Sequence, residues 1–361
     1  MSAPLLCPKS IHRKLRLFTS SEFLPPGRFH NWLLQAFWGT KADQDAVTCK
    51  RFANYFPRAH ELFAIGDVES PDAFLFPGQW DPAGGNHKIH ELARLAKSAH
   101  KPLIVFYDGD AEEPISVDNA LVFRTSMRAS RKLPNEIAMP AWTVDILGEY
   151  ADGRLRLRRK SAIPSVAYSG YVDYFDLLSL AVNIARRAKN IVRPSFTLKG
   201  GRLRGRAVRL LQRSPHIDTR FRLRRGLTPA NSVIYETRRR QFADNIIDAD
   251  YALTTRGNGN FSYRLYEIMS CGRIPVLINT DCVLPFDDVL DWRRLCVWVE
   301  ADDLPHLPDR VLEFHNNLTT DEFLQLQLDI RHVYEEWLSP CGFYSNMHRY
   351  VVDLSSPPSE R

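Results

Sequence analysis

The sequence has no long hydrophobic run, no CxxC pair and no cysteine–histidine cluster with zinc spacing. Its apolar stretches are much shorter than the roughly 20 residues that a membrane-spanning helix needs. The first residues show neither the apolar core nor the cleavage site of a secretory signal. The six cysteines are scattered over 361 residues, which predicts free thiols in a reducing compartment. We therefore expect a cytoplasmic protein.

Acidic residues are scarce in one segment. Residues 199–226 carry nine arginines and one lysine against a single acid, Asp218, whereas the whole chain has a net charge of only +6. Such a segment is typical of a solvated basic surface, and it can also attract phosphates, acidic glycans, an anionic membrane or nucleic acid. Phe221 is the only Phe, Tyr or Trp residue in this segment, so the pattern does not support a base-stacking platform. We expect no nucleic-acid partner, and we expect peripheral contact with an anionic inner membrane.

Apolar strands alternate with amphipathic helices along the whole chain, and this alternation predicts an α/β fold with parallel sheets. The predicted strands are 15–19, 72–77, 102–107, 120–126, 165–170, 251–255, 274–278 and 295–300. The predicted helices are 29–39, 51–63, 86–100, 171–190, 232–248, one from Ser262, 286–292 and 321–338. We expect two doubly wound, Rossmann-like domains, 1–163 and 164–338, and a C-terminal helix and tail, 339–361, that packs back on the first domain.

A polar loop follows the predicted strand 251–255, at the end of the sheet where open α/β folds bind ligands. It reads Arg256-Gly257-Asn258-Gly259-Asn260. The two glycines predict positive φ angles and a close approach of the backbone to a ligand. Successive amides in such a turn, together with the positive end of the next helix, favour an anion.

The helix after this loop carries three further candidates. Ser262 is the predicted N-cap, and Arg264 offers a guanidinium fork that matches phosphate oxygens. Glu267 lies three residues further on the same side, where its oxygens could accept from ribose hydroxyls. The pattern predicts a nucleotide diphosphate site. The alternative remains an ordinary turn followed by a helix in which Arg264 and Glu267 form an ion pair, because a lone glycine-rich loop is a weak signal.

The whole segment from Arg256 to Trp292 resembles the signature of the exostosin family of glycosyltransferases. It shows in order the Arg-Gly loop, Ser-x-Arg-x-x-Glu, a small-Gly-x-Ile-Pro-Val strand, Leu-Pro-Phe and an acidic Val-Leu-Asp-Trp. The resemblance covers about 235–312. It implies a GT-B architecture, in which two Rossmann-like domains face each other across a cleft. It also implies inverting transfer without an obligatory metal or other cofactor.

Carried over residue by residue, the resemblance assigns the Arg256 loop and Arg264 to the donor diphosphate. Glu267 takes the position that binds the nucleotide ribose, and Ser262 assists through its hydroxyl or its cap. Gly170 ends the predicted strand 165–170, so its amide is a further candidate for the diphosphate. The donor that we expect is a UDP-sugar, with a GDP-sugar as the alternative.

The N-terminal half resembles the family only loosely, so the catalytic base is chosen from chemistry. Inverting transfer needs a base on the acceptor hydroxyl. Asp108 and Asp110 follow a buried strand, and His87 begins a predicted helix. These three residues are the candidates.

We therefore expect a glycosyltransferase that moves a sugar from a nucleotide diphosphate sugar to a glycan or glycolipid hydroxyl. Two other classes stay open. One is a non-catalytic nucleotide-sugar or glycan-binding protein, and the other is a nucleic-acid-binding protein that uses the arginine-rich segment.

Overall fold

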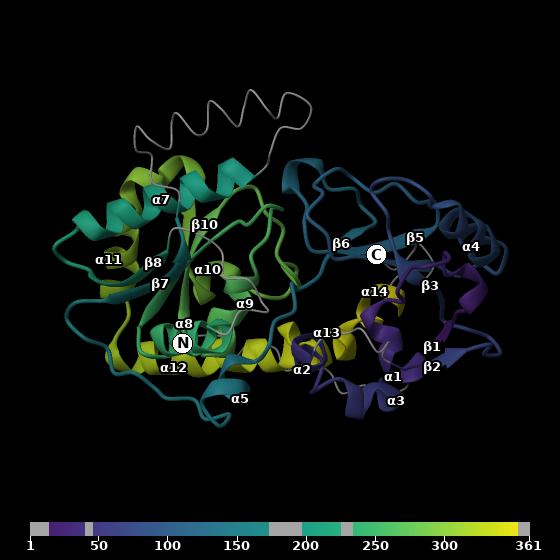
Figure 1. Ribbon diagram of the computed structural model, residues 1–361, viewed down its shortest axis with the longest axis horizontal. Coiled ribbons are helices and arrows are strands. Elements are labelled where there is room, and N and C mark those ends of the chain that lie inside the picture. Colours follow the sequence, from purple (N-terminus) through teal and green to yellow (C-terminus); the bar gives the residue numbers. More distant parts are fainter. Residues whose placement is uncertain (1–13, 40–45, 173–196, 225–233, 353–361) are drawn as a thin grey trace. The chain divides into compact units, whose positions relative to one another are not determined.

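The computed structural model describes residues 14–39, 46–172, 197–224 and 234–352, and the predicted helix 171–190 lies almost wholly outside these ranges. The chain folds into two compact units. Unit 1 comprises residues 1–144, 281–290 and 334–361, and unit 2 comprises residues 145–280 and 291–333. Each unit is built around one parallel sheet with helices on both of its faces (Figure 1).

Unit 1 contains a six-stranded sheet in the order β2-β1-β3-β4-β5-β6, in which all neighbouring pairs are parallel. Its strands are β1 (Leu15–Phe18), β2 (Phe63–Gly66), β3 (Ala73–Gln79), β4 (Leu103–Tyr107), β5 (Ala120–Arg124) and β6 (Glu136–Ala138). Its α-helices are α1 (Gln35–Trp38), α2 (Ala46–Arg51), α3 (Ala59–Leu62), α4 (His87–Ser98), α13 (Pro340–Asn346) and α14 (His348–Val352). Short 3₁₀ turns are η1 (Ser21–Phe23), η2 (Trp32–Leu34), η3 (Phe56–Arg58) and η4 (Ala129–Arg131), and η6 (Tyr334–Leu338) is a π-helical turn.

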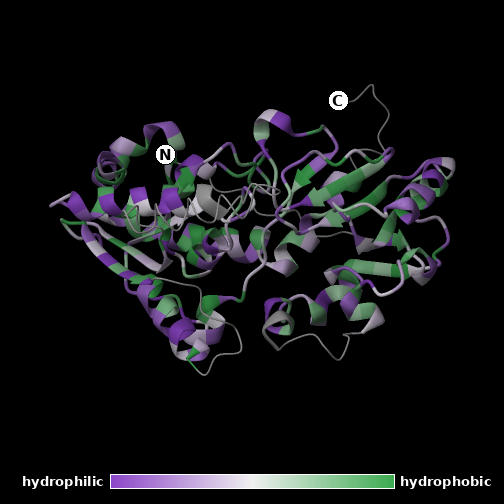
Figure 2. Ribbon diagram, turned by 45° about the horizontal axis from the view of Figure 1, so that its top comes forward, coloured by the Kyte–Doolittle hydropathy of each residue, from purple (hydrophilic) through white to green (hydrophobic). Residues whose placement is uncertain are grey.

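The core of unit 1 lies on both faces of its sheet. All five residues of β4 are buried, as expected for a strand that is covered on both sides. Helix α4 covers one face with four side chains at helical spacing, Ile89, Leu92, Ala93 and Ala96. On the other face, the rings of Phe343 and Tyr344 in α13 pack on aromatic residues of β5 and β4. Hydrophobic residues gather on these strands, and hydrophilic residues gather on the outer sides of the helices (Figure 2).

Unit 2 contains a five-stranded sheet in the order β11-β10-β9-β7-β8, again with parallel pairs throughout. Its strands are β7 (Ser165–Tyr171), β8 (Asp218–Arg224), β9 (Tyr251–Thr255), β10 (Ile274–Asn279) and β11 (Val297–Glu300). Its helices are α5 (Ile146–Tyr150), α7 (Thr197–Arg213), α8 (Tyr235–Ile247), α9 (Tyr263–Ser270), α10 (Trp292–Leu295), η5 (Ala301–His306), α11 (Leu307–Asn317) and α12 (Thr320–Val333). Helices α7 and α11 lie on one face of the sheet, and α8, α9 and α12 lie on the other (Figure 1).

The predicted fold class, two α/β domains with parallel sheets, is confirmed. Three strands were missed, namely the short edge strands β2 and β6 and the arginine-rich strand β8. Helix α7 was also missed. The predicted helix 286–292 is wrong: residues 285–289 form turns, and a helix begins only at Trp292, after Asp291 caps it by accepting from the amide of Arg293.

The predicted boundary between Ile163 and Pro164 differs from the division that the packing gives. Residues 145–163 belong to unit 2, because α5 buries Ile146 and Leu147 in the cluster under α8 and α9. Farther along this segment, Arg158 forms an ion pair with the buried Asp250, with 2.7 Å between Nε and Oδ1. The chain re-enters unit 1 at 281–290 and again from 334 onward.

Candidate functional site

The polar loop of the second half lies at the carboxyl end of the unit 2 sheet. Strands β7 and β9 pair in parallel, so the chain after Gly170 and the loop that begins at Arg256 leave the sheet at the same edge. Helix α7 packs against this loop through Gly200. A Cβ atom on Gly200 would stand 2.7 Å from the carbonyl oxygen of Gly257 and 2.8 Å from that of Arg256. Only glycine fits at that position of α7 without moving the loop.

Arg256 braces the loop from inside. Its side chain is buried, its Nη2 donates to the carbonyl of Asn258 at 2.9 Å, and its Nη1 donates to Oδ1 of Asn260 at 3.3 Å. Asn260 Oδ1 also accepts from the hydroxyl of Thr280 at 2.6 Å, which ties the loop to the end of β10. Gly257 and Gly259 depart from the expectation, because neither has a positive φ angle. The amide of Gly257 donates to the carbonyl of Phe261 at 2.8 Å. Gly259 is buried within the same loop.

Arg264 and Gly170 lie against each other, although 94 positions separate them in the sequence. Arg264 Nη2 donates to the carbonyl of Ser169 at 2.9 Å, and its guanidinium lies 4.5 Å from the ring centre of Tyr168. Its Nε is buried and has no hydrogen-bond partner among the described residues. Gly170 has a φ angle of +156°, and a Cβ there would stand 2.9 Å from Arg264 Nη2. The structure therefore brings together these two predicted residues.

Ser262 and Glu267 are also placed beside this edge, with partners that the sequence did not predict. Ser262 occupies the N-cap position of α9, but its side chain makes no capping hydrogen bond, and its Oγ accepts instead from Thr254 Oγ1 at 3.0 Å. Glu267 is mostly buried and forms an ion pair with Arg239 at 2.9 Å. Burial works to lower the pKa of Arg239, but Glu267 outweighs it with help from Tyr150, so the pKa of Arg239 is raised.

Positive charge is concentrated next to Arg264. Burial lowers the pKa of Arg224, and three nearby guanidinium groups, those of Arg238, Arg222 and Arg264, lower it further. Like charges that disfavour one another in this way create a positive potential that an anion relieves. Strand β8, which brings Arg222 and Arg224 to the carboxyl end of the sheet, thus adds to the electrostatics of the predicted diphosphate site.

Arg204 is a residue of this edge that the sequence analysis missed. From α7 it donates through Nη1 to the carbonyl of Tyr171 at 3.1 Å, through Nε to the hydroxyl of Thr255 at 3.4 Å, and through Nη2 to the carbonyl of Arg256 at 3.4 Å. It thereby links the ends of β7 and β9. The helix that carries Arg204 could have been predicted from four residues at helical spacing, Gly201, Gly205, Val208 and Leu211. They are buried, but two of them are glycines, so the hydrophobic pattern is weak.

In unit 1 the predicted bases follow the carboxyl ends of the adjacent strands β3 and β4. Asp108 comes directly after β4, and its Oδ2 accepts from the indole N–H of Trp32 at 3.0 Å. Its own amide donates to Oε1 of Gln79, the last residue of β3, at 3.2 Å. The structure thus fixes Asp108 through two contacts, and neither Trp32 nor Gln79 was among the predicted site residues.

The other two candidates are exposed. Asp110 is exposed, and its carbonyl accepts from Ser126 Oγ at 3.2 Å. His87 is the exposed first residue of α4. Asn86 before it closes the Asp81–Asn86 loop by accepting from the amide of Asp81 at 3.0 Å and donating to its carbonyl at 2.8 Å. All three candidates share one edge of the sheet, and Asp108 is the half-buried one, with its carboxylate bound to Trp32.

The described ranges also lack two common features. No helix in those ranges is both long enough and apolar enough to cross a bilayer. No group of three or more His, Cys, Asp or Glu side chains there is arranged to hold a metal ion. The five cysteines that the structure describes are all free thiols.

Comparison with known proteins relates a part of the second half of the chain to a family. Residues 199–313 match the sequence model of the exostosin GT47 domain. About a third of the chain thus resembles an exostosin GT47 domain. The resemblance noted in the sequence is thereby confirmed. The matched range includes most of α7, β8 and the loop of Arg256, whereas Gly170 and the rest of β7 precede it. Within this domain lie the Arg256 loop, Arg264 and Glu267.

Curated relatives align over a similarly limited part of the chain. The probable glucuronosyltransferase GUT1 of Oryza sativa subsp. japonica is 38% identical over 79 residues, which are 22% of this chain and 18% of the relative. Exostosin-1 of Drosophila melanogaster is 34% identical over 64 residues, which are 18% of this chain and 8% of the relative. The chain thus spans less than a fifth of the length of these relatives.

Two solved structures that align with this chain share little sequence with it. TarM aligns with 71% of this chain and 50% of its own, with a TM-score of 0.34 and 10% identity. WaaG, a glycosyltransferase involved in lipopolysaccharide biosynthesis, aligns with 95% of this chain and 99% of its own, with a TM-score of 0.33 and 8% identity.

Proposed function

We propose that this protein transfers a sugar from a nucleotide diphosphate sugar to a hydroxyl group of a glycan or glycolipid. The observation that carries the proposal is the positive edge of the unit 2 sheet, where Arg264 and Gly170 meet beside the loop of Arg256. Guanidinium groups and a helix N-terminus at one edge of a parallel sheet suit a diphosphate. A UDP-sugar is the proposed donor, and a GDP-sugar is the alternative.

Each residue of the edge has a proposed part in donor binding. Arg264 offers its buried, unpaired Nε and its stacked guanidinium to the diphosphate. Gly170 leaves the space that a phosphate oxygen needs next to that guanidinium. Arg256 acts indirectly, because its hydrogen bonds hold the loop in shape. Glu267, held by Arg239, is proposed to accept from the ribose hydroxyls.

The proposed reaction inverts the donor carbon and needs no metal at the diphosphate. A base takes the proton of the acceptor hydroxyl, the new glycosidic bond forms, and the bond to the diphosphate breaks. Asp108 is the proposed base because Trp32 and Gln79 orient it. Negative charge then builds on the leaving nucleotide diphosphate, and Arg264 with its neighbouring arginines stabilises it.

The relatives suggest which sugar to test first. Some of them are named probable glucuronosyltransferases, so UDP-glucuronate belongs in any donor panel for this chain. The non-catalytic alternative, a nucleotide-sugar-binding protein, predicts the same donor affinity without turnover.

Thermal unfolding with a panel of UDP- and GDP-sugars tests the donor site. A ligand at about 100 times its Kd adds roughly 2.7 kcal/mol to the unfolding free energy, which raises Tm by several degrees. We expect one nucleotide family to do this for the wild-type protein. Arg264→Ala should abolish the shift, and Arg264→Lys should reduce it, because an ammonium keeps the charge but lacks the guanidinium fork.

Arg213→Ala is the matched control. Arg213 is the exposed last residue of α7, at the opposite end of that helix from the turn that meets Gly257, and its removal changes the net charge equally. It should leave the nucleotide-induced shift unchanged. If no nucleotide sugar stabilises the well-folded wild-type protein, the donor site is refuted. If Arg213→Ala lowers the shift as much as Arg264→Ala, the effect comes from overall charge and the assignment of Arg264 is wrong.

A further inference from the structure

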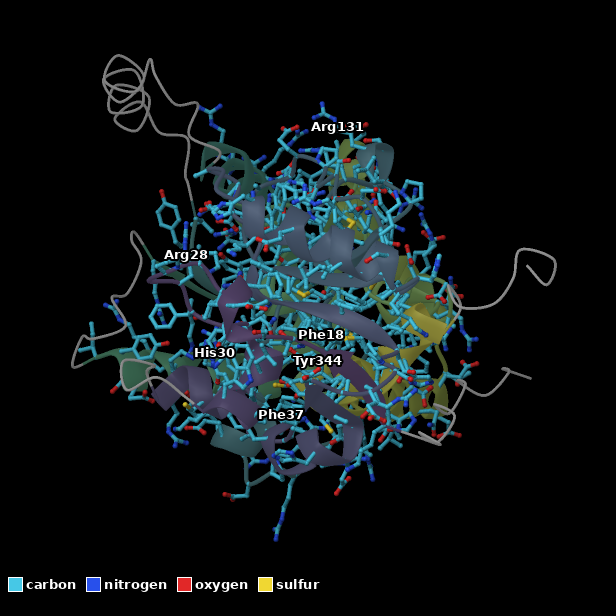
Figure 3. All side chains as sticks on the ribbon, turned by 90° about the vertical axis from the view of Figure 1, so that its right-hand side faces the viewer. Phe18, Arg28, His30, Phe37, Arg131 and Tyr344 are labelled. Carbon is cyan, nitrogen blue, oxygen red and sulfur yellow. The ribbon has the colours of Figure 1, made fainter. Side chains whose placement is uncertain are left out.

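Unit 1 contains a pocket that none of the preceding assignments uses. Its volume is about 790 Å3, within the roughly 300–1,000 Å3 range of small-molecule sites. It lies where β1 and β2 end, at the same edge of the sheet as Asp108. Figure 3 shows two of its residues, Phe18 and His30, among the side chains of unit 1. The lining residues are Phe18, Thr19, Ser20, Ser21, Glu22, His30, Trp38, Gly39 and Asp67.

The lining combines aromatic rings with hydrogen-bonding side chains. Phe18 and Trp38 are half-buried, and the indole of Trp38 packs edge-on against His30 with 5.8 Å between ring centres. Thr19 is 4% exposed, and its hydroxyl has no hydrogen-bond partner among the described residues. Apolar ring faces next to hydroxyl and carboxylate groups match a sugar, whose ring carbons are apolar and whose edge carries hydroxyl groups.

The lining of the pocket carries two acidic residues, Glu22 and Asp67. Glu22 and Asp67 are exposed, and neither has an ion-pair partner in the described part of the chain. None of the nine lining residues is a lysine or an arginine. Two unpaired carboxylates repel an anion and accept hydrogen bonds from hydroxyl or ammonium groups. The pocket therefore differs in sign from the arginine-rich edge of unit 2.

The pocket is connected to the proposed base within unit 1. His30 lines the pocket two residues before Trp32, whose indole N–H bonds Asp108. Strand β3 lies between β1 and β4, and its last residue, Gln79, accepts from the amide of Asp108. A sugar in the pocket would thus lie at the sheet edge that carries the base.

We propose that this pocket binds the acceptor, through a sugar unit that carries no anionic group. The unit is a neutral or amino sugar, with Trp38 against its ring face and with Glu22 and Asp67 accepting from its hydroxyl or ammonium groups. The word acceptor rests on the proposed function, whereas the binding of the sugar itself does not.

Ligand-observed NMR titration of the full chain tests the pocket. The probes are matched methyl glycosides of a hexose, its 2-amino derivative and its uronic acid, in the gluco, galacto and manno series. In at least one series we expect the neutral or amino sugar to bind about tenfold more tightly than the uronate at low salt. This preference should shrink as salt screens the two carboxylates.

Two variants separate the contacts. Trp38→Ala should weaken binding about tenfold, because about 50 Å2 of apolar contact is lost, and Trp298→Ala, a half-buried tryptophan in unit 2, is its control. The double change Glu22→Gln with Asp67→Asn alters only exposed side chains. It should remove the preference against the uronate without affecting folding.

The outcomes distinguish this proposal from the proposed function. The pocket assignment is overturned if no glycoside binds in any series, if the uronate binds best, or if folded Trp38→Ala binds as the wild type does. Donor binding and transfer would survive each of those results. If a neutral or amino sugar binds through Trp38 but no nucleotide sugar stabilises the protein, the pocket stands as a carbohydrate site and the proposed transferase function fails.

Discussion

A buried ion pair under the segment that carries Asp108 and Asp110 gives the sharpest test of the packing in unit 1. Arg124 and Glu136 are 0% and 1% exposed, and they form a close ion pair between β5 and β6. Arg124 also donates to the carbonyls of Glu113, at 2.8 Å, and Ala111, at 2.6 Å. The pair therefore anchors the chain that follows the proposed base.

Removing the charge of Glu136 leaves a guanidinium buried without its counter-ion. Glu136 also accepts from two backbone amides, those of Ile115 and Leu133, each at 2.8 Å. Breaking a buried pair by changing one partner costs about 3–5 kcal/mol. Glu136→Gln keeps the shape of the side chain, so we expect a loss in this range from the charge rather than from a cavity.

Urea denaturation measures this loss. With a slope of about 1–3 kcal/mol per molar urea, the midpoint of the unit 1 transition should fall by more than about 1 M. Glu113→Gln is the control, because that carboxylate is 79% exposed and lies 4.0 Å from Arg131, and its midpoint should match the wild type. A loss below about 1 kcal/mol for Glu136→Gln would refute the reasoning, since Arg124 would then have another way to satisfy its charge.

Three further predictions follow from single contacts. Gly200→Ala should weaken nucleotide binding despite the higher helix propensity of alanine, because its Cβ would stand 2.7 Å from the carbonyl of Gly257. Gly257→Ala, whose Cβ would meet nothing closer than 3.6 Å, should keep the Tm of the unliganded protein. Burial lowers the pKa of His315 from 6.5, so the folded state favours the neutral ring. The free energy of unfolding should therefore be intact above pH 6.5 and fall as the pH drops through that value, and His315→Gln should flatten this part of the pH profile. Trp32→Phe removes the N–H that holds Asp108, so kcat should fall about tenfold with little change in the KM for the donor, and an unchanged kcat and pH profile would show that Trp32 only packs.

The sequence predicted the features that depend on local pattern. Buried β-branched and aromatic runs such as Leu103–Tyr107 mark strands of a parallel sheet wherever they occur, so most strands were found. Helix α7 was missed because glycines, rather than large apolar residues, occupy several of its buried positions, as Gly201 and Gly205 show. The strand β8 was missed because arginine alternates with Phe221 and Leu223, and the charge concealed the two-residue period.

The sequence named candidate residues for the site but not their orientation. The motif identified the loop and Arg264, yet spacing could not show that Arg256 turns inward to brace the loop while Arg264 stacks on Tyr168. Those directions follow from contacts between strands far apart in the sequence. The same holds for Trp32, in η2, and Asp108, directly after β4, which are 76 residues apart in the sequence and meet only in the folded chain.

Release of nucleoside diphosphate is the measurement that tests the central claim most directly. The donor that raises Tm most would be incubated with the saccharide panel, and the freed nucleotide would be quantified for the wild type, Arg264→Ala and Arg213→Ala. The account predicts release that depends on a saccharide acceptor, falls at least about a hundredfold in Arg264→Ala, and is unchanged in Arg213→Ala. Tight donor binding without release by the wild type, with every acceptor of the panel, would contradict it and identify a nucleotide-sugar-binding protein instead.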